Sequence, residues 1–372
     1  MQCMVNMEGI LSFKKDMNPL YFPTICAAPS VNQSHFEMKH AKIQQFLCKI
    51  CFIKIFEEDV HQNVIENKLF SNGDTVAIGA SGGKDSSVLI HVLKVLNDKY
   101  NYRIKIVLVS IDEGIKGYRD DSLLSVKKNC YDYNFDLFIV SFKQLYGWSM
   151  DEIVAKIGRK SNCTFCGVFR RQALDRAATH IKADKLVTGH NADDVAETIV
   201  MNMLRCDAAR LSRCTNIITN DSIEMPRSKP MMYCYEKDIV MYAHFQKLKY
   251  FSTECTYFPN SFRGYARDYV KDLEKINPLS ILNIISCAQN FDIKTSVRIP
   301  TLKNCQQCNY VSSNNICAAC KLINGLEKNI PLREIIRNRK VKFDNISDST
   351  VIEVNRVRDR FQNISNEYSN CK

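Results

Sequence analysis

The chain has 372 residues, 45% of them hydrophobic and 24% charged, which argues against a disordered chain and leaves room for more than one structural unit. Lys and Arg number 51 against 40 Asp and Glu, and this net charge of +11 is compatible with a polyanionic partner without establishing one. No apolar run approaches about eighteen residues, so the sequence predicts no transmembrane helix and no membrane partner.

The N-terminal part of the sequence carries little pattern before residue 48. Residues 1–47 show weak periodicity and three prolines, and we expect a poorly defined extension there. Residues 48–72 then follow a helical pattern that begins with Cys48 and Cys51. This Cys-x-x-Cys pair is half of a tetrahedral zinc site, so we expect a partial zinc module and a helix. The candidate partners are Cys26, His35 and His40, and spacing does not choose among them.

A glycine-rich loop follows the apolar run 75–80 and opens a second helical pattern. Its residues are Ser81, Gly82, Gly83, Lys84, Asp85 and Ser86. Two glycines let the backbone approach a phosphate closely, and the free N–H groups of a helix start bind its oxygens. The spacing differs from a Walker A loop, which has four residues between its glycines. It is similar to the loop of the N-type ATP pyrophosphatases, which adenylate an acceptor, and a plain strand–turn–helix corner is the alternative.

Short apolar runs alternate with helical patterns between residues 74 and 225. The runs 104–110, 137–140 and 185–189 read as strands. This alternation predicts an α/β fold, a doubly wound parallel sheet covered on both faces, which we assign to residues 73–300. Ligands bind beyond the carboxyl ends of such strands, and the glycine loop, residues 111–114 and residues 189–191 all fall there.

Four cysteines near the C-terminus form the clearest metal pattern, as two Cys-x-x-Cys pairs: Cys305, Cys308, Cys317 and Cys320. Four thiolates fill a tetrahedral zinc site, so we expect a structural zinc module over residues 301–326 rather than four unrelated thiols. This use of cysteine favours metal or redox chemistry in a reducing compartment over secreted disulfides. Residues 327–372 mix charge runs with Asn and Ser, and we expect them to be partly disordered.

Another Cys-x-x-Cys pair, Cys163 and Cys166, lies inside the predicted α/β domain among basic residues. Helix N-termini and neighbouring cations lower thiol pKa values, which suits a nucleophile, a redox pair or an iron ligand. A metal site here needs a third cysteine from elsewhere in the chain. The candidates are Cys130, Cys206, Cys214, Cys234 and Cys255, and spacing leaves the choice open.

Several motifs in this order resemble the tRNA 2-thiouridine synthetases, a family of N-type ATP pyrophosphatases. They are the glycine loop, the Cys163/Cys166 pair, and segments 189–194 (Gly-His-Asn-Ala-Asp-Asp), 226–230 (Pro-Arg-Ser-Lys-Pro) and 250–255 (Tyr-Phe-Ser-Thr-Glu-Cys). The similarity runs from about Cys48 to Gly325. Two features depart from the family. Its Cys-x-x-Cys upstream of Cys48 is missing, and its Leu-Arg-Gly-Asp has Cys206 in place of the glycine.

The resemblance implies an ATP-dependent tRNA sulfurtransferase that adenylates the C2 oxygen of the wobble uridine and replaces it with sulfur, delivered through an iron–sulfur cluster or a persulfide. The ATP contacts it implies are Ala80, Ser81, Gly82, Gly83, Lys84, Ser86, Arg170 and Gly189. The catalytic residues it implies are Cys163, Cys166, Cys255, Asp85 and Asp193, with the three cysteines holding a four-iron cluster. Asp193 or Asp194 would hold Mg²⁺ or orient the reacting groups, and a helix N-cap before Val195 is the alternative role.

The resemblance also implies partners that no residue of this sequence shows by itself. They are tRNA, a paralogous second subunit and a ubiquitin-like sulfur carrier protein, all in the cytoplasm. Three alternatives share the fold: an amide ligase, a tRNA cytidine 2-thiolase and a non-catalytic tRNA-binding subunit. A ligase has no need of the three cysteines, and the cytidine enzyme is not expected to carry the C-terminal zinc module. A subunit without catalysis is expected to have lost Lys84, Asp85 or the Cys163/Cys166 pair.

Overall fold

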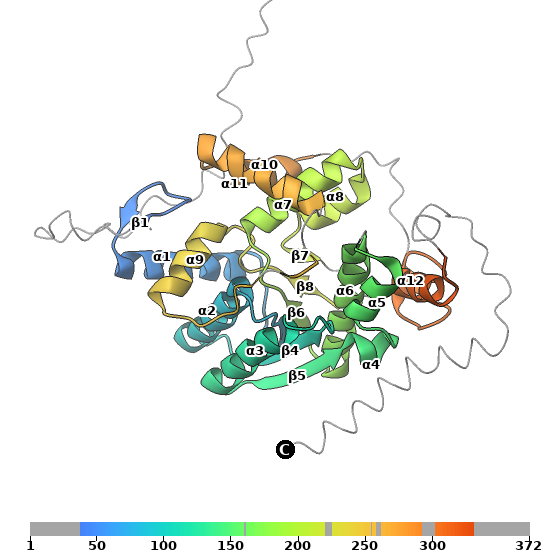
Figure 1. The fold of residues 1–372 in the computed structure, drawn as a ribbon. Coiled ribbons are helices and arrows are strands. Elements are labelled where there is room, and N and C mark those ends of the chain that lie inside the picture. The colour runs from blue at the N-terminus through green and yellow to red at the C-terminus, as the bar shows by residue number, and fades with distance from the viewer. Residues whose placement is uncertain are drawn as a thin grey trace, which may run out of the picture.

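The centre of the molecule is a six-stranded sheet in the order β5–β4–β3–β6–β8–β7 (Figure 1). The computed structural model describes residues 38–159, 161–219, 225–253, 255–257, 262–291 and 302–330. The strands are β3 (Thr75–Gly79), β4 (Lys105–Asp112), β5 (Asp136–Ser141), β6 (Lys185–Val187), β7 (Ile218–Thr219) and β8 (Arg227–Ser228). Neighbouring strands run parallel, except that β7 pairs antiparallel with β8.

Helices cover both faces of this sheet. Val76 and Ile78 of β3 point into one apolar core and Ala77 into the other, as alternating strand positions do. The first core contains residues of α1 (Lys49–Glu66), α2 (Lys84–Tyr100), α3 (Arg119–Tyr133) and α9 (Glu236–Phe245). The second contains residues of α4 (Phe142–Tyr146), α5 (Met150–Ile157) and α6 (Asn162–His180). The predicted α/β fold is therefore confirmed.

A third apolar core lies at one end of the sheet, at the top of Figure 1. It joins α7 (Ala192–Leu204), α8 (Ala208–Cys214), α10 (Phe262–Ile276) and α11 (Ser280–Gln289). None of the helices in the described ranges is long and apolar enough to cross a membrane.

Small elements flank the main domain on both sides. β1 (Met38–Lys39) and β2 (Phe46–Leu47) pair antiparallel and lead into α1, whose N-cap is Cys48. At the other end, β9 (Lys303–Asn304), β10 (Val311–Ser312) and α12 (Ala318–Glu327) form the C-terminal module. Most of the predicted N-terminal extension, 1–37, and most of the predicted tail, 331–372, lie outside the described residues.

A buried acid–base pair ties the N-terminal hairpin to α9. His40 and Asp238 are each 2% exposed, with His40 Nδ1 3.8 Å from Asp238 Oδ2. The backbone N–H of Ala41 donates to Asp238 Oδ1 at 3.2 Å. Burial lowers the pKa of His40 to about 4 and raises the pKa of Asp238 to about 7. The hairpin is thus anchored through a carboxyl group that is costly to ionise.

We expect Asp238→Asn to change how stability depends on pH. The folded protein keeps the Asp238 proton up to about pH 7, whereas an unfolded Asp releases it near pH 3.9. This group's contribution is therefore complete below about pH 4 and is lost as pH rises to about 7. Relative to wild type, Asp238→Asn gains about 4 kcal/mol across that range, since a difference of about three pKa units is worth this much. Thermal unfolding of both proteins at several pH values measures it, and a pH-independent difference would contradict the expectation.

Candidate active site

The glycine loop between β3 and α2 is held open by its own side chains. Ser86 Oγ donates to the Gly83 carbonyl oxygen at 2.9 Å, and Ser81 N–H donates to Ser86 Oγ at 3.3 Å. Gly82 has a φ of 75°, and a Cβ there would lie 2.4 Å from the Ser122 carbonyl oxygen. Glycine is therefore required, and the start of α2 directly after it is a candidate anion cradle, as helix N-termini are in general.

Two further predicted residues fix the walls of this cradle. The Ala80 N–H donates to the Val109 carbonyl at 2.8 Å, which extends the sheet bonding into the loop. A Cβ on Gly189 would lie 3.0 Å from the backbone carbonyl of Asp85. The glycine thus lets the end of β6 approach the start of α2.

Charged side chains cross the cleft in front of the loop. Lys84 Nζ lies 2.7 Å from Glu236 Oε1 and 3.4 Å from Asp85 Oδ2. Burial opposes charge on Glu236, but the Lys84 ammonium outweighs it and lowers the pKa of Glu236 to about 2. Burial also raises the pKa of Asp85 more than Lys84 lowers it, and Asn191 Nδ2 donates to Asp85 Oδ1 at 3.1 Å. Perturbed ionisable groups in one cleft are typical of a functional site.

Asp193 lies at the start of α7 and is 2% exposed. It accepts from the Glu236 N–H at 2.7 Å and from Lys271 Nζ at 2.5 Å. Burial raises the pKa of Asp193, although Lys271 opposes this. The Lys271 ammonium also lies 3.1 Å from Glu236 Oε2, so one cation holds two carboxylates of the cleft.

Asp194 does not act as the N-cap that the sequence offered as an alternative. The helix starts at Ala192 with Asn191 as its N-cap, and Asp194 completes a capping box with Asn191. Its Oδ1 also accepts from Arg263 Nη2 of α10 at 2.7 Å. The N-cap role is wrong because the helix begins three residues earlier than the apolar pattern indicated.

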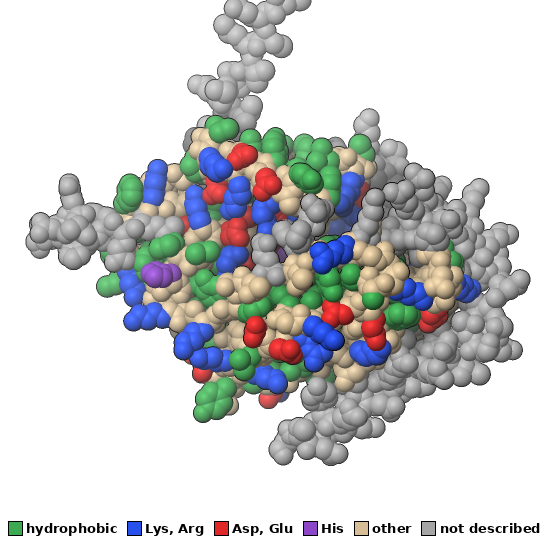
Figure 2. Space-filling view, viewed as in Figure 1, with side chains coloured by type: hydrophobic (Ala, Val, Ile, Leu, Met, Phe, Trp, Pro, Cys, Tyr) green, Lys and Arg blue, Asp and Glu red, His purple; other side chains and the backbone are tan. Residues whose placement is uncertain are grey.

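The cleft has a volume of about 340 Å³, and it is lined by polar side chains and by aromatic rings, among them Lys84, Asp85, Tyr118, Asp193, Glu236 and Phe251. Figure 2 shows basic and acidic side chains alternating on the surface between α10 and α9. This alternation agrees with the ion pairs of Lys84 and Lys271. The cleft is thus large enough for a nucleotide, and its lining holds more carboxylates than cations.

The cysteine pair lies at the start of α6, beside an ion pair. Arg170 Nη2 is 3.4 Å from Cys166 Sγ and 2.7 Å from Glu113 Oε1. Glu113, which is 7% exposed, raises the pKa of Arg170. Burial raises the pKa of the Cys166 thiol to about 11. Burial also raises the pKa of Cys163, and the nearby Cys255 thiol adds to the shift at both cysteines. Among the described residues these three thiols do not all lie within 4.8 Å of one another, so a shared metal site stays a prediction.

Tyr118 lies between the cleft and two of these cysteines, Cys166 and Cys255. It lines the cleft and packs edge-on against Phe251, with 5.2 Å between ring centroids. Burial raises the pKa of Tyr118, and Glu113, Cys255 and Cys166 raise it further. The strand ends thus bring the glycine loop after β3 and Tyr118 after β4 to one edge of the sheet, with Cys166 and Cys255 near Tyr118.

Two residues of this site, Tyr118 and Glu236, are not among those that the sequence singled out, and Glu113 lies in segment 111–114, which the sequence placed at the site without giving Glu113 a role. Glu113 follows strand β4 directly, so its place at a strand end carried a signal. Glu236 carried none, because its position depends on how α9 packs against α2. The guanidinium of Arg170 contacts Glu113 and Cys166, and its contact with ATP stays a prediction.

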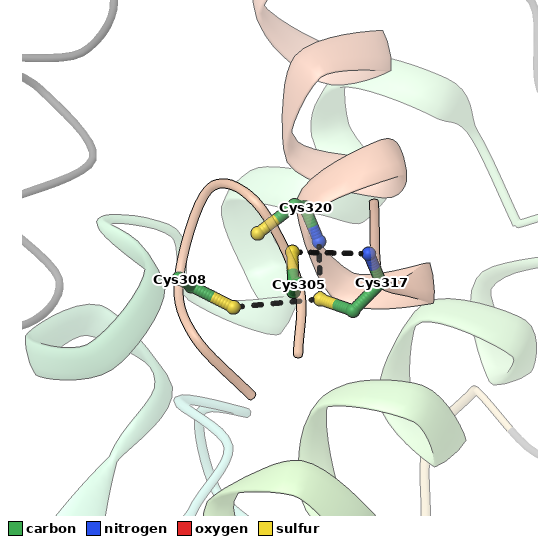
Figure 3. A group of neighbouring side chains, drawn as sticks. All are labelled: Cys305, Cys308, Cys317 and Cys320. Carbon is green, nitrogen blue, oxygen red and sulfur yellow. Dashed lines mark hydrogen bonds between the residues drawn. The ribbon is translucent and has the colours of Figure 1, made fainter. Parts of the chain in front are cut away.

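The C-terminal cysteines converge from two loops and α12 (Figure 3). The sulfur atoms of Cys305, Cys308, Cys317 and Cys320 all lie within 4.8 Å of one another. Four converging thiols with no oxygen or nitrogen donor among them fit Zn²⁺ in a closed tetrahedral site. Cys48 and Cys51 belong to no such group in the described part of the chain, so zinc there stays a prediction. Of their candidate partners, Cys26 and His35 lie outside the described residues.

The departure at Cys206 has a visible backbone consequence. Helix α7 ends at Leu204, Arg205 is its C-cap, and Cys206 follows with a φ of 52°. This left-handed conformation favours glycine, because a Cβ clashes with the following carbonyl. A glycine at this place in the related motif is therefore explained by the helix end.

We expect Cys206→Gly to raise the free energy of unfolding by about 1 kcal/mol. Relief of left-handed strain, about 1–2 kcal/mol, exceeds the extra chain entropy that glycine loses on folding, roughly 0.5–1 kcal/mol. Urea unfolding measures the change, with Cys206→Ala as a control that keeps the Cβ. A glycine variant no more stable than the alanine variant would show that the turn is unstrained.

Comparison with known proteins supports the interpretation of fold and site. Residues 54–273 match the PP-loop domain family, and residues 303–332 match a zinc-ribbon family. The parallel sheet, the glycine loop and the four-cysteine module therefore define a PP-loop protein with a C-terminal zinc ribbon. The second match also confirms the zinc module that the cysteine spacing predicted.

Similar proteins show which PP-loop proteins this chain is related to. The chain is 55% identical over 325 residues to cytoplasmic tRNA 2-thiolation protein 1 of Caenorhabditis elegans, which covers 87% of each chain. It is 56% identical over 307 residues to the Arabidopsis thaliana protein of that name, covering 82% of this chain and 86% of the relative. The chain belongs to the cytoplasmic tRNA 2-thiolation protein 1 family.

A solved structure agrees with this membership. The U34-tRNA thiolase NcsA from Methanococcus maripaludis, solved with its 4Fe-4S cluster, matches 83% of this chain and 97% of its own. The TM-score is 0.68 and the sequence identity is 29%.

Proposed function

We propose that this protein is an ATP-dependent tRNA sulfurtransferase that 2-thiolates the wobble uridine of cytoplasmic tRNAs. One observation carries the proposal: Tyr118 lines the cleft of the glycine loop, and its pKa responds to the Cys166 and Cys255 thiols, which supports a cysteine site beside the cleft. An adenylating loop alone supports many reactions, whereas an adenylating loop next to free thiols suits replacement of an oxygen by sulfur. The names of the relatives, tRNA 2-thiolation protein and U34-tRNA thiolase, support the same substrate.

The residues of the loop are suited to binding and activating ATP. The N–H groups of Gly83 and Lys84 at the start of α2 would hold phosphate oxygens, and the Lys84 ammonium would balance their charge. Asp85 and Asp193 would hold Mg²⁺ or orient the acceptor oxygen, since carboxylates are its preferred ligands. Adenylation of the uridine C2 oxygen releases pyrophosphate and makes that oxygen a good leaving group, which departs with AMP when sulfur attacks C2.

The three cysteines fit an iron–sulfur cluster by the chemistry of their donor set. Cys163 and Cys166 lie one helical turn apart on α6, and Cys255 approaches from a different segment. Arg170 donates to Cys166, as expected of a group that stabilises a thiolate. A cluster held by Cys163, Cys166 and Cys255 would supply the sulfur for the transfer, and a persulfide on one of these cysteines is the alternative carrier.

The same proposal includes partners and a compartment. We infer a basic contact surface for tRNA, a paralogous second subunit and a ubiquitin-like carrier that delivers sulfur. The cytoplasm is the compartment given in the relatives' names. An intact Lys84, Asp85 and Cys163/Cys166 set favours catalysis over a purely tRNA-binding role, and the zinc ribbon favours uridine over cytidine as the substrate base.

The test is thiolation by the purified, anaerobically reconstituted protein with ATP, sulfide and a tRNA that carries an unmodified wobble uridine. We expect 2-thiouridine, seen as retardation on a mercury-containing gel, with one AMP and one pyrophosphate per sulfur. Thiolation at cytidine would favour the cytidine enzyme. No product even with the second subunit and sulfur carrier added would favour a tRNA-binding subunit.

A further inference from the structure

Helix α6 presents different residues to two different neighbours. Cys163, Cys166 and Arg170 recur at three- and four-residue steps and therefore lie on one side of the helix, the side of the candidate site. Phe165 and Phe169 are four residues apart on another side, where both are buried in the second apolar core. The contacts that fix the buried side of α6 therefore also fix the position of Cys163 and Cys166.

The start of α6 has little support of its own. Its N-cap, Ser161, has a φ of 69° and makes no side-chain capping bond. Its first turn contains no acidic residue that would stabilise the positive end of the helix. The turn that carries Cys163 and Cys166 must therefore be fixed mainly by contacts made further along the helix.

The zinc ribbon supplies many of those contacts. Figure 1 shows α12 packed beside α6. Gln172 Nε2 donates to Cys317 Sγ at 3.5 Å, so α6 hydrogen-bonds directly to a zinc ligand. Arg176 Nη2 donates to the carbonyl of Cys308 at 3.3 Å, and its guanidinium lies 5.7 Å from the centre of the Tyr310 ring.

Asp175 ties α6 to two further segments at once. Its side chain is 7% exposed. Its Oδ1 accepts from Arg227 Nε at 2.9 Å, and its Oδ2 accepts from the Tyr310 hydroxyl of the ribbon. Arg227 of β8 also donates to the carbonyl of Arg171 on α6 at 2.8 Å. A buried carboxylate that loses such partners is strongly penalised, so this junction joins the sheet, α6 and the ribbon in one arrangement.

We propose that the zinc ribbon is a positioning element for the cysteine site, acting on α6 through Gln172, Asp175 and Arg176. Loaded with zinc, the ribbon holds the buried side of α6 and thereby fixes the opposite side, where Cys163 and Cys166 lie. That the positions of Cys163 and Cys166 matter for activity rests on the proposed thiolation. That the ribbon fixes their positions does not depend on it.

The test measures the cysteine geometry without relying on a cluster. In zinc-loaded, cluster-free protein, iodoacetamide alkylation of Cys166 is followed by mass spectrometry, with the exposed Cys287 as an internal reference. Asp175→Asn and Gln172→Ala are expected to speed Cys166 alkylation by about tenfold while Cys287 is unchanged and zinc is retained. Asp272→Asn, which changes an exposed ion pair on α10, is the matched control and is expected to react as wild type.

A third variant tests the role of zinc itself. Cys308→Ser removes one ribbon ligand and is expected to lose zinc and expose Cys166 in a protein whose sheet, judged by circular dichroism, remains folded. In reconstituted protein, Asp175→Asn, Gln172→Ala and Cys308→Ser are expected to lose the visible iron–sulfur absorption faster than wild type. Wild-type alkylation of Cys166 in Asp175→Asn and Cys308→Ser would overturn the coupling. Failure of the wild type to bind a cluster or thiolate tRNA would instead count against the proposed function alone.

Discussion

Cys255→Ala is expected to lower tRNA thiolation by at least about 100-fold, since loss even of residues that support a metal ligand costs about 10- to 100-fold. The reason is the ligand count. Cys163 and Cys166 supply two thiols from α6. Cys255 is the candidate for the third, because it raises the pKa of both Cys163 and Cys166. Two protein thiolates cannot hold a cluster as three do, so iron content is expected to fall together with activity.

The measurement is complementation of cells that lack their own enzyme, read by mercury-gel retardation of tRNA, together with the iron content of purified protein. Cys287→Ala, which removes an exposed thiol from α11, is the matched control and is expected to behave as wild type. Normal thiolation by Cys255→Ala together with loss in Cys206→Ala would move the third ligand to Cys206.

Local patterns in the sequence predicted those parts of the site that are built from consecutive residues. The loop needs a glycine at position 82, where φ is positive and the backbone is close to Ser122. The glycine in the sequence therefore indicates this conformation directly. The four-cysteine module is likewise local, because two short turns bring its thiols together. The alternation of strands and helices also predicted that the site lies at one edge of the sheet.

Contacts between distant segments were not predictable in the same way. Glu236 reaches Lys84 only because α9 packs against α2, and Asp175 meets Tyr310 only because the ribbon docks on α6. Neither contact can be predicted from the spacing of neighbouring residues in the sequence. The role of Arg170 shows the same limit: its position near the site was predictable, but its choice of Glu113 as partner depends on where β4 ends relative to α6.

Lys84→Ala is expected to lower ATP-dependent thiolation by about 10²–10³-fold, the range seen when one preorganised electrostatic group is removed from an active site. Lys84 lies on the first turn of α2, where its ammonium faces the cleft and Glu236. ATP brings negative charge into a cleft that already holds Asp85, Asp193 and Glu236. Without Lys84 this repulsion is unopposed at the loop, so both ATP binding and adenylation are expected to suffer.

The loss is expected to be functional rather than structural. In Lys84→Ala, Glu236 keeps the Lys271 ammonium at 3.1 Å, so its buried carboxylate still has a cation. Lys94→Ala is the matched control, because Lys94 lies on the same helix in an exposed pair with Asp98. Pyrophosphate release and thermal unfolding measured on both variants separate the two explanations. Equal activity of Lys84→Ala and Lys94→Ala would remove Lys84 from the ATP site, whereas equal unfolding temperatures with activity lost only in Lys84→Ala identify it as the residue that offsets phosphate charge.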